Sequence, residues 1–414
     1  MKTIGRRFIG VIILMITSLC SHAATDGIEI HGSVRNQRNN RAIAGADITV
    51  VGTNIGTITN SDGVFTLKLP TEHAHASLIV RHIGFINNEI PLDSISNLSQ
   101  ARILLTPSGR MLNEVIVRGG DAREIVEAAY SKIDDNYAGN KSLSSAFYRE
   151  TIQKGRRFIG VTEGVIDVHK HPYGRGNFLS DKVRVRKGRR LISQKAADTI
   201  AVKMVGGPTL PVFLDFIKNH DALFSPTEMG FYEFKMKDPI LIDNRQHFAI
   251  GFTPVWHQDY VMFEGTLYID QETLTITRAE YAMDMYDKNK ATSALLLKKP
   301  FGLRFSPQEC SYVVDYTLND EGKATIHYIG VKTRFKCDWK KRLFSSGYLI
   351  NSEMIITDRD EHPQEGIARR DAFGRNDIFY DMVENYWDPD FWKDYNIIEP
   401  SESLEKAVGK LKHK

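Results

Sequence analysis

Two pairs of histidines have a spacing that suits metal binding. His73 and His75, and separately His169 and His171, are two residues apart, so in a strand both rings of a pair point to one face. A transition metal can bridge two imidazoles held in this way. However, His75 lies near a turn and His171 precedes a proline, and exposed loop histidines are the commoner outcome. We therefore expect no metal and no cofactor at either pair.

A third motif has the spacing of a hydrolytic zinc site. His362 and Glu365 are separated by two residues, as are two ligands of zinc carboxypeptidases. Such a site needs a third protein ligand downstream, and His413, near the end of the tail, is the one histidine that follows. The charged residues 358–361 are typical of a solvated loop. We expect no metal here either.

The sequence contains no motif that identifies a catalytic centre. GxSxG, HExxH, Walker A and paired CxxC patterns are absent, which removes the simplest hydrolase, zincin, nucleotide and zinc-ribbon interpretations. A hydrolase of glycan or peptide would have to use carboxylates such as Asp215, Glu163 or Glu264. We therefore expect a protein without catalytic residues.

Two clusters of side chains suit binding better than catalysis. One is basic and consists of Lys182, Arg184, Arg186, Lys187, Arg189 and Arg190. It suits lipid headgroups or an acidic glycan, although a strand edge protected by charge is the commoner role. The other combines aromatic and acidic residues, namely Tyr380, Tyr386, Trp387, Phe391, Trp392 and Tyr395 with Asp377, Asp381, Asp388 and Asp390.

The aromatic cluster fits a sugar platform, a docking seam, or a tail strapped over an exposed sheet, and the last is the favoured interpretation. From both clusters we predict a possible ligand or partner surface. Its residues are Tyr386, Trp387, Phe391, Trp392, Arg184 and Arg186.

The first residues of the chain predict export. Lys2, Arg6 and Arg7 precede an apolar run at 8–19, which is shorter than the ~20 residues of a spanning helix, and we expect cleavage after Ala23. Lipidation at Cys20 is a less favoured alternative. The three basic residues account for the whole net charge of +3, since 54 basic residues less these 3 leave 51 against 51 acidic ones. A neutral chain gives no electrostatic reason to expect nucleic acid.

The two cysteines that remain after cleavage are expected to be free and buried. The runs 309–318 and 323–339 flank a turn at 319–322 and predict a hairpin. Centring the pairing on that turn places Cys310 opposite Val331, roughly 20 Å from Cys337 at ~3.3 Å per residue. A disulfide needs Cα atoms within ~7 Å, so we expect none.

The elements that carry these residues are mostly strands, and the predicted fold class is mainly β. Residues 28–106 contain at least five short strand patterns with Gly, Asn and Asp between them, which predicts a small antiparallel sandwich. Asn60, Ser61, Asp62 and Gly63 fit a tight turn, in which Gly63 can take a positive φ and the Asp62 side chain can bond its own backbone.

Specific residues in this first part resemble a known family. Gly32-Ser33-Val34, Ile43-Ala44-Gly45-Ala46, Asp62-Gly63-Val64-Phe65 and Ile83-Gly84-Phe85 resemble the carboxypeptidase-regulatory-like, transthyretin-related module of Bacteroidetes-type envelope proteins. The resemblance implies a transthyretin-like β-sandwich in the periplasm or at the outer membrane. It also implies that residues 107–120 form the linker strand that commonly follows such modules, and it implies no catalysis.

The second part, 121–400, is predicted to be a larger antiparallel β-rich α+β domain with a few helices. An amphipathic helix at 121–137 begins it, and a capped helix at 401–414 follows it. The pattern at 265–270 resembles the curved sheets of periplasmic lipoprotein carriers. Separately, residues 147–150 and the C-terminal tail resemble Bacteroidetes-type envelope proteins that join the regulatory-like module to a β-rich domain.

These observations predict a non-enzymatic exported envelope protein with a binding or assembly role, at the periplasm or outer membrane. An envelope or outer-membrane protein is its expected partner, and no transmembrane helix is expected after signal removal. A lipid or glycan carrier with a curved sheet and a hydrolase with unidentified carboxylates remain alternatives.

Overall fold

A computed structural model describes residues 27–109, 121–174, 179–195, 198, 200–219, 223–340, 345–374, 377–388 and 395–413. The predicted signal segment with Cys20, most of the predicted linker 107–120, and Phe391 and Trp392 lie outside the described residues. The chain is mainly β with antiparallel sheets and few helices, as predicted. The described helices are all too short or too polar to cross a membrane.

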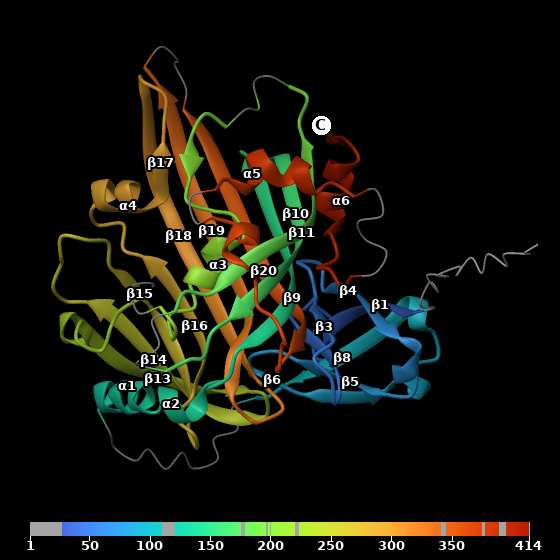
Figure 1. Ribbon diagram of the computed structural model, residues 1–414. Coiled ribbons are helices and arrows are strands. Elements are labelled where there is room, and N and C mark those ends of the chain that lie inside the picture. Colours follow the sequence, from blue (N-terminus) through green and yellow to red (C-terminus); the bar gives the residue numbers. More distant parts are fainter. Residues whose placement is uncertain are drawn as a thin grey trace, which may run out of the picture.

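Residues 27–107 form a β-sandwich, here called the sandwich (Figure 1). One sheet has the order β4-β1-β8-β6 and the other has the order β3-β2-β5-β7. Their bounds are β1 Gly27–Asn36, β2 Asp47–Val50, β3 Gly56–Ile58, β4 Val64–Pro70, β5 Ser77–Arg81, β6 Phe85–Ile86, β7 Asn88–Pro91 and β8 Ala101–Pro107. Alternate residues of these strands, such as Ile30, Ile48, Phe65 and Val80, fill its core.

The predicted turn at 60–63 forms, but a different side chain stabilises it. Gly63 has φ 73°, a conformation that glycine adopts without a Cβ clash. The Asn60 carboxamide oxygen, rather than Asp62, accepts from the backbone N–H groups of residues 62 and 64, at 2.9 and 3.1 Å. Asp62 instead accepts from the backbone N–H of Glu402, 2.7 Å away, and so ties the turn to the C-terminal helix.

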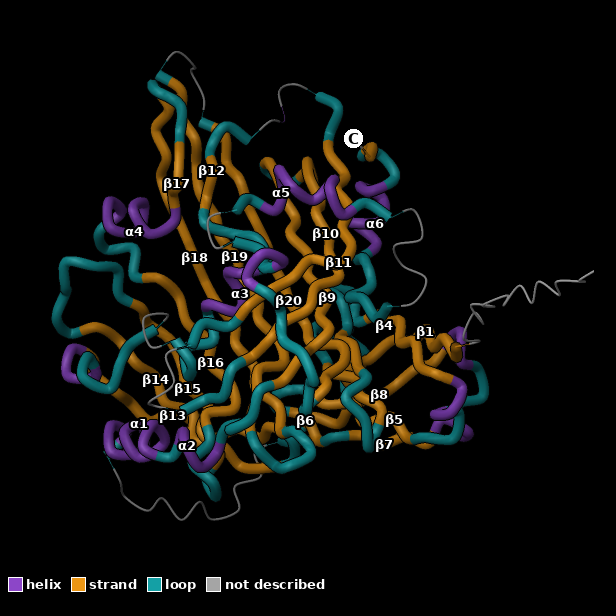
Figure 2. Tube along the Cα trace, viewed as in Figure 1, coloured by secondary structure: helices purple, strands orange, loops and turns teal. Residues whose placement is uncertain are grey.

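Strands of the described residues beyond 121 form one eleven-stranded antiparallel sheet, here called the main sheet (Figures 1 and 2). Its order is β13-β14-β15-β16-β18-β19-β20-β9-β10-β11-β21. The bounds are β9 Ser142–Lys154, β10 Arg157–Lys170, β11 Lys182–Ile192, β13 Tyr232–Ile242, β14 Arg245–Pro254, β15 Phe263–Asp270, β16 Ile276–Met283, β18 Leu303–Leu318, β19 Ala324–Trp339, β20 Ser346–Asp360 and β21 Lys412–His413. Short strands β12 Lys203–Met204 and β17 Leu296–Lys298 pair separately.

One face of the main sheet, the core face, is covered by short helices and loops. These helices are α1 Ala122–Ser131, α2 Ile133–Asn136, α3 Thr209–Phe213, α4 Lys288–Leu295 and α5 Phe379–Met382, with a 3₁₀ turn at Val383–Tyr386. Asp121 caps α1 as expected, because its carboxylate accepts from the backbone N–H of residue 123 at 3.1 Å. Tyr148, Phe216 and Phe379 belong to the large apolar cluster on this face.

The opposite face, here called the outer face, carries the sandwich. Because side chains alternate along β9, Phe147 points to the outer face while Tyr148 points to the core face. Phe147 and Ile355 of the main sheet share a buried cluster with Ile58 of the sandwich and Ile398 of the tail. Figure 1 shows the sandwich beside the lower ends of β9 and β20.

Both cysteines are free and buried, as predicted, but the predicted hairpin register is wrong by two residues. Cys310 lies opposite Thr333 rather than Val331. The turn pairs Leu318 with Ala324, which shifts the centre by one position. A β-bulge shifts it by a second position, because Asp315 pairs with Tyr328 while the next pair is residues 316 and 326.

Candidate functional site

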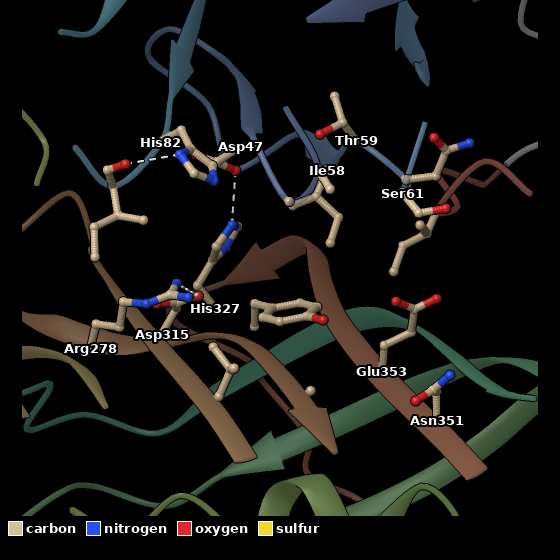
Figure 3. A pocket seen from close by; sticks show the side chains of 18 of the residues that line it. Asp47, Ile58, Thr59, Ser61, His82, Arg278, Asp315, His327, Asn351 and Glu353 are labelled. Carbon is tan, nitrogen blue, oxygen red and sulfur yellow. Dashed lines mark hydrogen bonds and ion pairs between the residues drawn. The ribbon is translucent and has the colours of Figure 1, made fainter. Parts of the chain in front are cut away.

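A cleft of about 740 Å³ lies between the sandwich and the outer face of the main sheet (Figure 3). Its floor consists of alternate residues of β18, β19, β20 and β9, including Asn351 and Glu353. The sandwich turn at 59–61 lies over this floor, and residues 398–401 of the tail form one wall. Three segments that are distant in the sequence therefore enclose one polar space.

A row of alternating charges crosses the floor and continues along the outer face. Glu353 of β20, Arg149 of β9, Glu163 of β10 and Arg189 of β11 lie directly opposite one another in the strand register. The Arg149 guanidinium is 2.7 Å from the Glu163 carboxylate and 3.6 Å from that of Glu353, and Arg189 is 2.7 Å from Glu163. Cross-strand pairs of opposite charge stabilise an antiparallel sheet.

The two acids of this row differ in their protonation chemistry. Burial alone would raise the pKa of Glu163, but the guanidinium groups of Arg149 and Arg189 hold it below its usual range. Glu353 has only the more distant Arg149, and burial raises its pKa above the ordinary value. Glu353 is thus the acid of this row with capacity left to accept a hydrogen bond from a ligand.

A second row of polar side chains forms the floor at the other side of the cleft. The Arg278 guanidinium contacts both oxygens of Asp315, at 2.6 and 2.7 Å. Tyr328, opposite Asp315, lies over Gly330, where an added Cβ would come within 2.7 Å of the tyrosine hydroxyl. The absence of a side chain at Gly330 therefore lets the Tyr328 ring lie flat on the sheet between the two rows.

An ion-pair cluster joins the sandwich to the main sheet at one end of the cleft. His327 is the extra residue of the β19 bulge, and its imidazole lies 2.9 Å from the Asp47 carboxylate, a contact drawn in Figure 3. The Arg81 guanidinium also contacts Asp47 at 3.1 Å, and its other end lies 3.5 Å from Asp243 in the turn between β13 and β14. These contacts fix the position of the sandwich over the floor.

Part of the floor has polar groups that no other described side chain or backbone group binds. The side chains of Asn351 and Gln153 make no hydrogen bond within the described part of the chain, although both line the cleft. The Thr277 hydroxyl is buried and likewise has no hydrogen-bond partner among the described residues. The Asn351 and Gln153 amides are available to a ligand, whereas a buried polar group without a partner, such as the Thr277 hydroxyl, carries a free-energy cost.

The charges of the cleft are balanced. Five acidic and five basic side chains line it, together with three histidines. This balance suits a polar ligand with little net charge and offers no strong field for a polyanion. The polar groups are mostly amides, hydroxyls and carboxylates, which bind by hydrogen bonds.

The structure gives the six residues of the predicted binding surface different environments. Arg184 and Arg186 both contact Asp167, at 2.6 and 2.9 Å, and Arg186 also lies over the Tyr395 ring. Trp387 is 45% exposed, and Tyr386 packs partly against the apolar cluster of the core face. Phe391 and Trp392 lie outside the described residues.

The whole basic cluster contacts groups of its own chain. Arg189 and Arg190 contact Glu163 and Glu384, Lys187 contacts Asp388, and Lys182 donates to a backbone carbonyl at 367. Many of the basic residues of β11 therefore bind the C-terminal segment, as expected for a tail that packs over the sheet.

The carboxylates considered for a hydrolase are not brought together. Asp215 is fully buried on the core face, where it accepts from the hydroxyls of Tyr173 and Tyr316 and contacts Lys170. Glu163 lies on the outer face between two arginines, and Glu264 is exposed on β15. These three acids occupy three separate environments.

The histidine pairs behave differently from each other. The rings of His169 and His171 lie together, 4.8 Å apart, whereas His75 contacts Asp93 and His73 contacts Glu72. His362 is an exposed residue of a bend after β20. Over the residues that the structure describes, no group of three or more His, Cys, Asp or Glu side chains could hold a metal ion.

A smaller pocket lies on the core face. It has a volume of about 170 Å³ and is lined by Ile152, Ile159, Val202 and Phe379 around the Glu150 carboxyl group. Burial raises the pKa of Glu150, against hydrogen bonds from Tyr148 and from a backbone N–H at 207. A large apolar cluster occupies much of the rest of this face.

Sequence reasoning missed the residues of the cleft. Asn351 and Glu353, like Thr151 and Gln153, lie at alternate positions of β20 and β9, but the neighbouring Ser352 and Glu150 are also polar, so the sequence does not distinguish the two faces there. The sandwich residues that cover them, such as Asp47 and Ser61, have no signal in the sequence, because their role depends on how the two parts are placed.

Comparison with known proteins identifies the first part of the chain. Residues 30–117 match the model of the CarboxypepD_reg-like domain, in agreement with the resemblance found in the sequence. No curated protein sequence matches the chain.

Several solved structures are similar to somewhat more than half of the chain. A domain assigned to outer membrane lipoprotein sorting from Vibrio parahaemolyticus is 12% identical and covers 60% of this chain and 94% of its own, with a TM-score of 0.26. A DUF1329 family protein from Desulfovibrio piger is 13% identical over 60% and 96% of the two chains, with a TM-score of 0.23. MucB is 10% identical over 57% and 92%, with a TM-score of 0.19. Likenesses of this size carry no functional argument.

Proposed function

We propose that the protein is a non-enzymatic binding protein of the cell envelope that holds a polar ligand in the cleft between the sandwich and the main sheet. The observation that carries the proposal is the cleft itself, whose 740 Å³ falls within the ~300–1,000 Å³ usual for ligand sites. Its uncommitted amides and balanced charges favour binding by hydrogen bonds.

Two further observations support this assignment over the alternatives. A carrier that holds an acyl chain in its sheet needs a large apolar cavity, and the pocket on the core face is smaller than the ~300 Å³ lower limit, at about 170 Å³. A hydrolase needs convergent groups, whereas Asp315 in the cleft is held at both oxygens by Arg278.

The compartment is part of the proposal. The expected export signal and the resemblance to Bacteroidetes-type envelope proteins favour the periplasm or the outer membrane. In this setting the ligand is a component of the envelope, and a binding or assembly role follows.

The experiment is affinity capture from solubilised envelopes with the wild-type protein, the Glu353→Gln/Asn351→Ala double variant and the exposed control Glu264→Gln. We expect at least one envelope component to be recovered with the wild-type and control proteins and to fall at least fivefold with the double variant. Recovery of the same components by all three proteins, or of none, would overturn the proposal.

A further inference from the structure

The tail of the chain lies against the cleft as an extended segment, and three of its carbonyl groups accept hydrogen bonds. Residues 395–400, here called the tail segment, form neither helix nor strand. Arg149 donates to the carbonyl of residue 398 at 2.7 Å, Thr57 to that of 397 at 2.9 Å, and Asn60 to that of 400 at 3.0 Å. The main sheet and the sandwich therefore already bind one extended segment by its carbonyl groups.

The tail segment also shows how a side-chain amide engages an extended backbone in this molecule. The Asn396 amide donates to the Lys68 carbonyl at 3.0 Å, and its oxygen accepts from the Lys68 N–H at 2.7 Å. One amide thus satisfies both backbone groups of one residue. This geometry depends little on the side chain of the bound residue.

The unused amides on the floor of the cleft have a suitable spacing for the same interaction. Asn351 pairs with Thr151, and Gln153 lies two residues beyond Thr151 on the same face. Such diagonal neighbours are roughly 7–8 Å apart. Alternate residues of an extended chain are about 6.6 Å apart. The two side-chain amides have a similar separation, so one can bind one residue of an extended ligand and the other can bind the next residue but one.

From these contacts we infer that the cleft binds an extended polypeptide segment of an envelope protein, alongside the tail segment, with Asn351 and Gln153 holding its main chain. The inference rests on the proposed function and names the ligand class. Recognition is directed at the backbone and is therefore tolerant of sequence.

The charges of the cleft restrict the side chains that this segment carries. The lining is balanced between acids and bases, so a segment of low net charge is favoured. Glu353 has one distant partner, Arg149 at 3.6 Å, and can accept from a lysine or arginine of the ligand. The half-buried Tyr328 offers a ring for an apolar or aromatic side chain.

The test uses a displayed library of random dodecapeptides and the purified protein. We expect selected peptides whose dissociation constant rises at least tenfold in the Asn351→Ala/Gln153→Ala variant and stays within twofold in Glu264→Ala. Methylation of alternate backbone nitrogens in a selected peptide should raise the dissociation constant at least tenfold, while alanine substitution of most of its side chains should change it less than threefold.

Failure of this inference is distinguishable from failure of the proposed function. A parallel titration uses soluble peptidoglycan fragments and neutral oligosaccharides. If no selected peptide depends on Asn351 and Gln153 but a saccharide does, the inference is overturned and the cleft remains a binding site. Peptides whose binding survives backbone methylation also overturn it. If neither class binds in a way that depends on the two amides, both proposals fail.

Discussion

Asp47 shows how a single carboxylate joins the two parts of the molecule and makes that junction depend on pH. Burial alone would raise the pKa of Asp47, but the charges of His327 and Arg81 and the hydrogen bonds to it lower the pKa from 3.8 to about 2. A carboxylate with a depressed pKa stabilises the fold above its unfolded pKa and loses that contribution as the pH falls toward 2.

We expect Asp47→Asn to lower the free energy of unfolding at pH 7 by about 2 kcal/mol, since one pKa unit corresponds to ~1.4 kcal/mol. The difference from the wild-type protein should shrink between pH 4 and pH 2. Urea titrations of both proteins across that range provide the measurement. A difference that stays constant down to pH 2.5 contradicts the role assigned to Asp47.

The core face contains a buried charge cluster that the proposed function does not use. Lys170 contacts Asp181 at 2.7 Å and Asp215 at 2.5 Å, and all three side chains are at least 97% buried. Burial alone would lower the pKa of Lys170, but the two aspartates raise it well above its ordinary value.

Replacing this lysine should be costly because two buried acids lose their counter-charge. We expect Lys170→Met to destabilise the protein by about 3–5 kcal/mol in urea unfolding at pH 7. Adding Asp215→Asn to that variant should recover part of the loss. A cost below about 1 kcal/mol, or no recovery in the double variant, would show that the cluster is not maintained by this ion pair.

At the scale of elements, two glycines allow the C-terminal segment to pack closely on the main sheet. Gly164 of β10 and Gly188 of β11 lie opposite each other on the core face. A Cβ at Gly188 would come within 2.5 Å of Val383, and one at Gly164 within 2.9 Å of Phe379. The absence of side chains on both strands lets the α5 region approach the sheet closely.

We expect Gly188→Ala to destabilise the protein by about 1–3 kcal/mol and to speed amide exchange in residues 379–386. Val383→Ala in the same protein should recover much of the loss by removing the clashing methyl group. Hydrogen exchange read by mass spectrometry, with urea unfolding, tests both. Unchanged exchange in that segment would mean that the docking tolerates the added methyl group.

The tail segment offers a second prediction at this scale. Asn396→Ala removes two hydrogen bonds to the Lys68 backbone, each worth about 0.5–1.5 kcal/mol. The Lys68 amide should exchange faster in this variant, while Glu405→Ala, at an exposed position of α6 Glu402–Val408, leaves it unchanged. Equal exchange at Lys68 in the two variants would rule out the proposed anchoring.

Element types were largely predictable, whereas their exact pairing was not. The alternation in β15 and β16 and the acid before α1 lead directly to the observed hairpin and helix. The register of β18 and β19 could not be predicted from their own sequences, because the bulge at His327 is stabilised by Asp47 in a distant part of the chain. Strand patterns specify faces, and a bulge depends on tertiary contacts.

At the scale of the whole molecule, the site arises from the placement of one part on another. The apolar cluster of Ile58, Phe147, Ile355 and Ile398 joins the sandwich, the main sheet and the tail segment. The cleft could not be predicted from the sequence of the sandwich, the main sheet or the tail segment alone. The basic strand and the aromatic tail were visible in the sequence, but the structure pairs much of that strand with the chain's own C-terminal segment.

The most direct test of the central claim is photo-crosslinking in the living cell. A photo-reactive amino acid replaces Asn351 on the floor of the cleft or, as the control, the exposed Glu264 of the same sheet. We predict a crosslinked adduct with an envelope component at position 351 at least fivefold above that at position 264. Equal yields at the two positions, or no adduct at position 351, would contradict binding in the cleft.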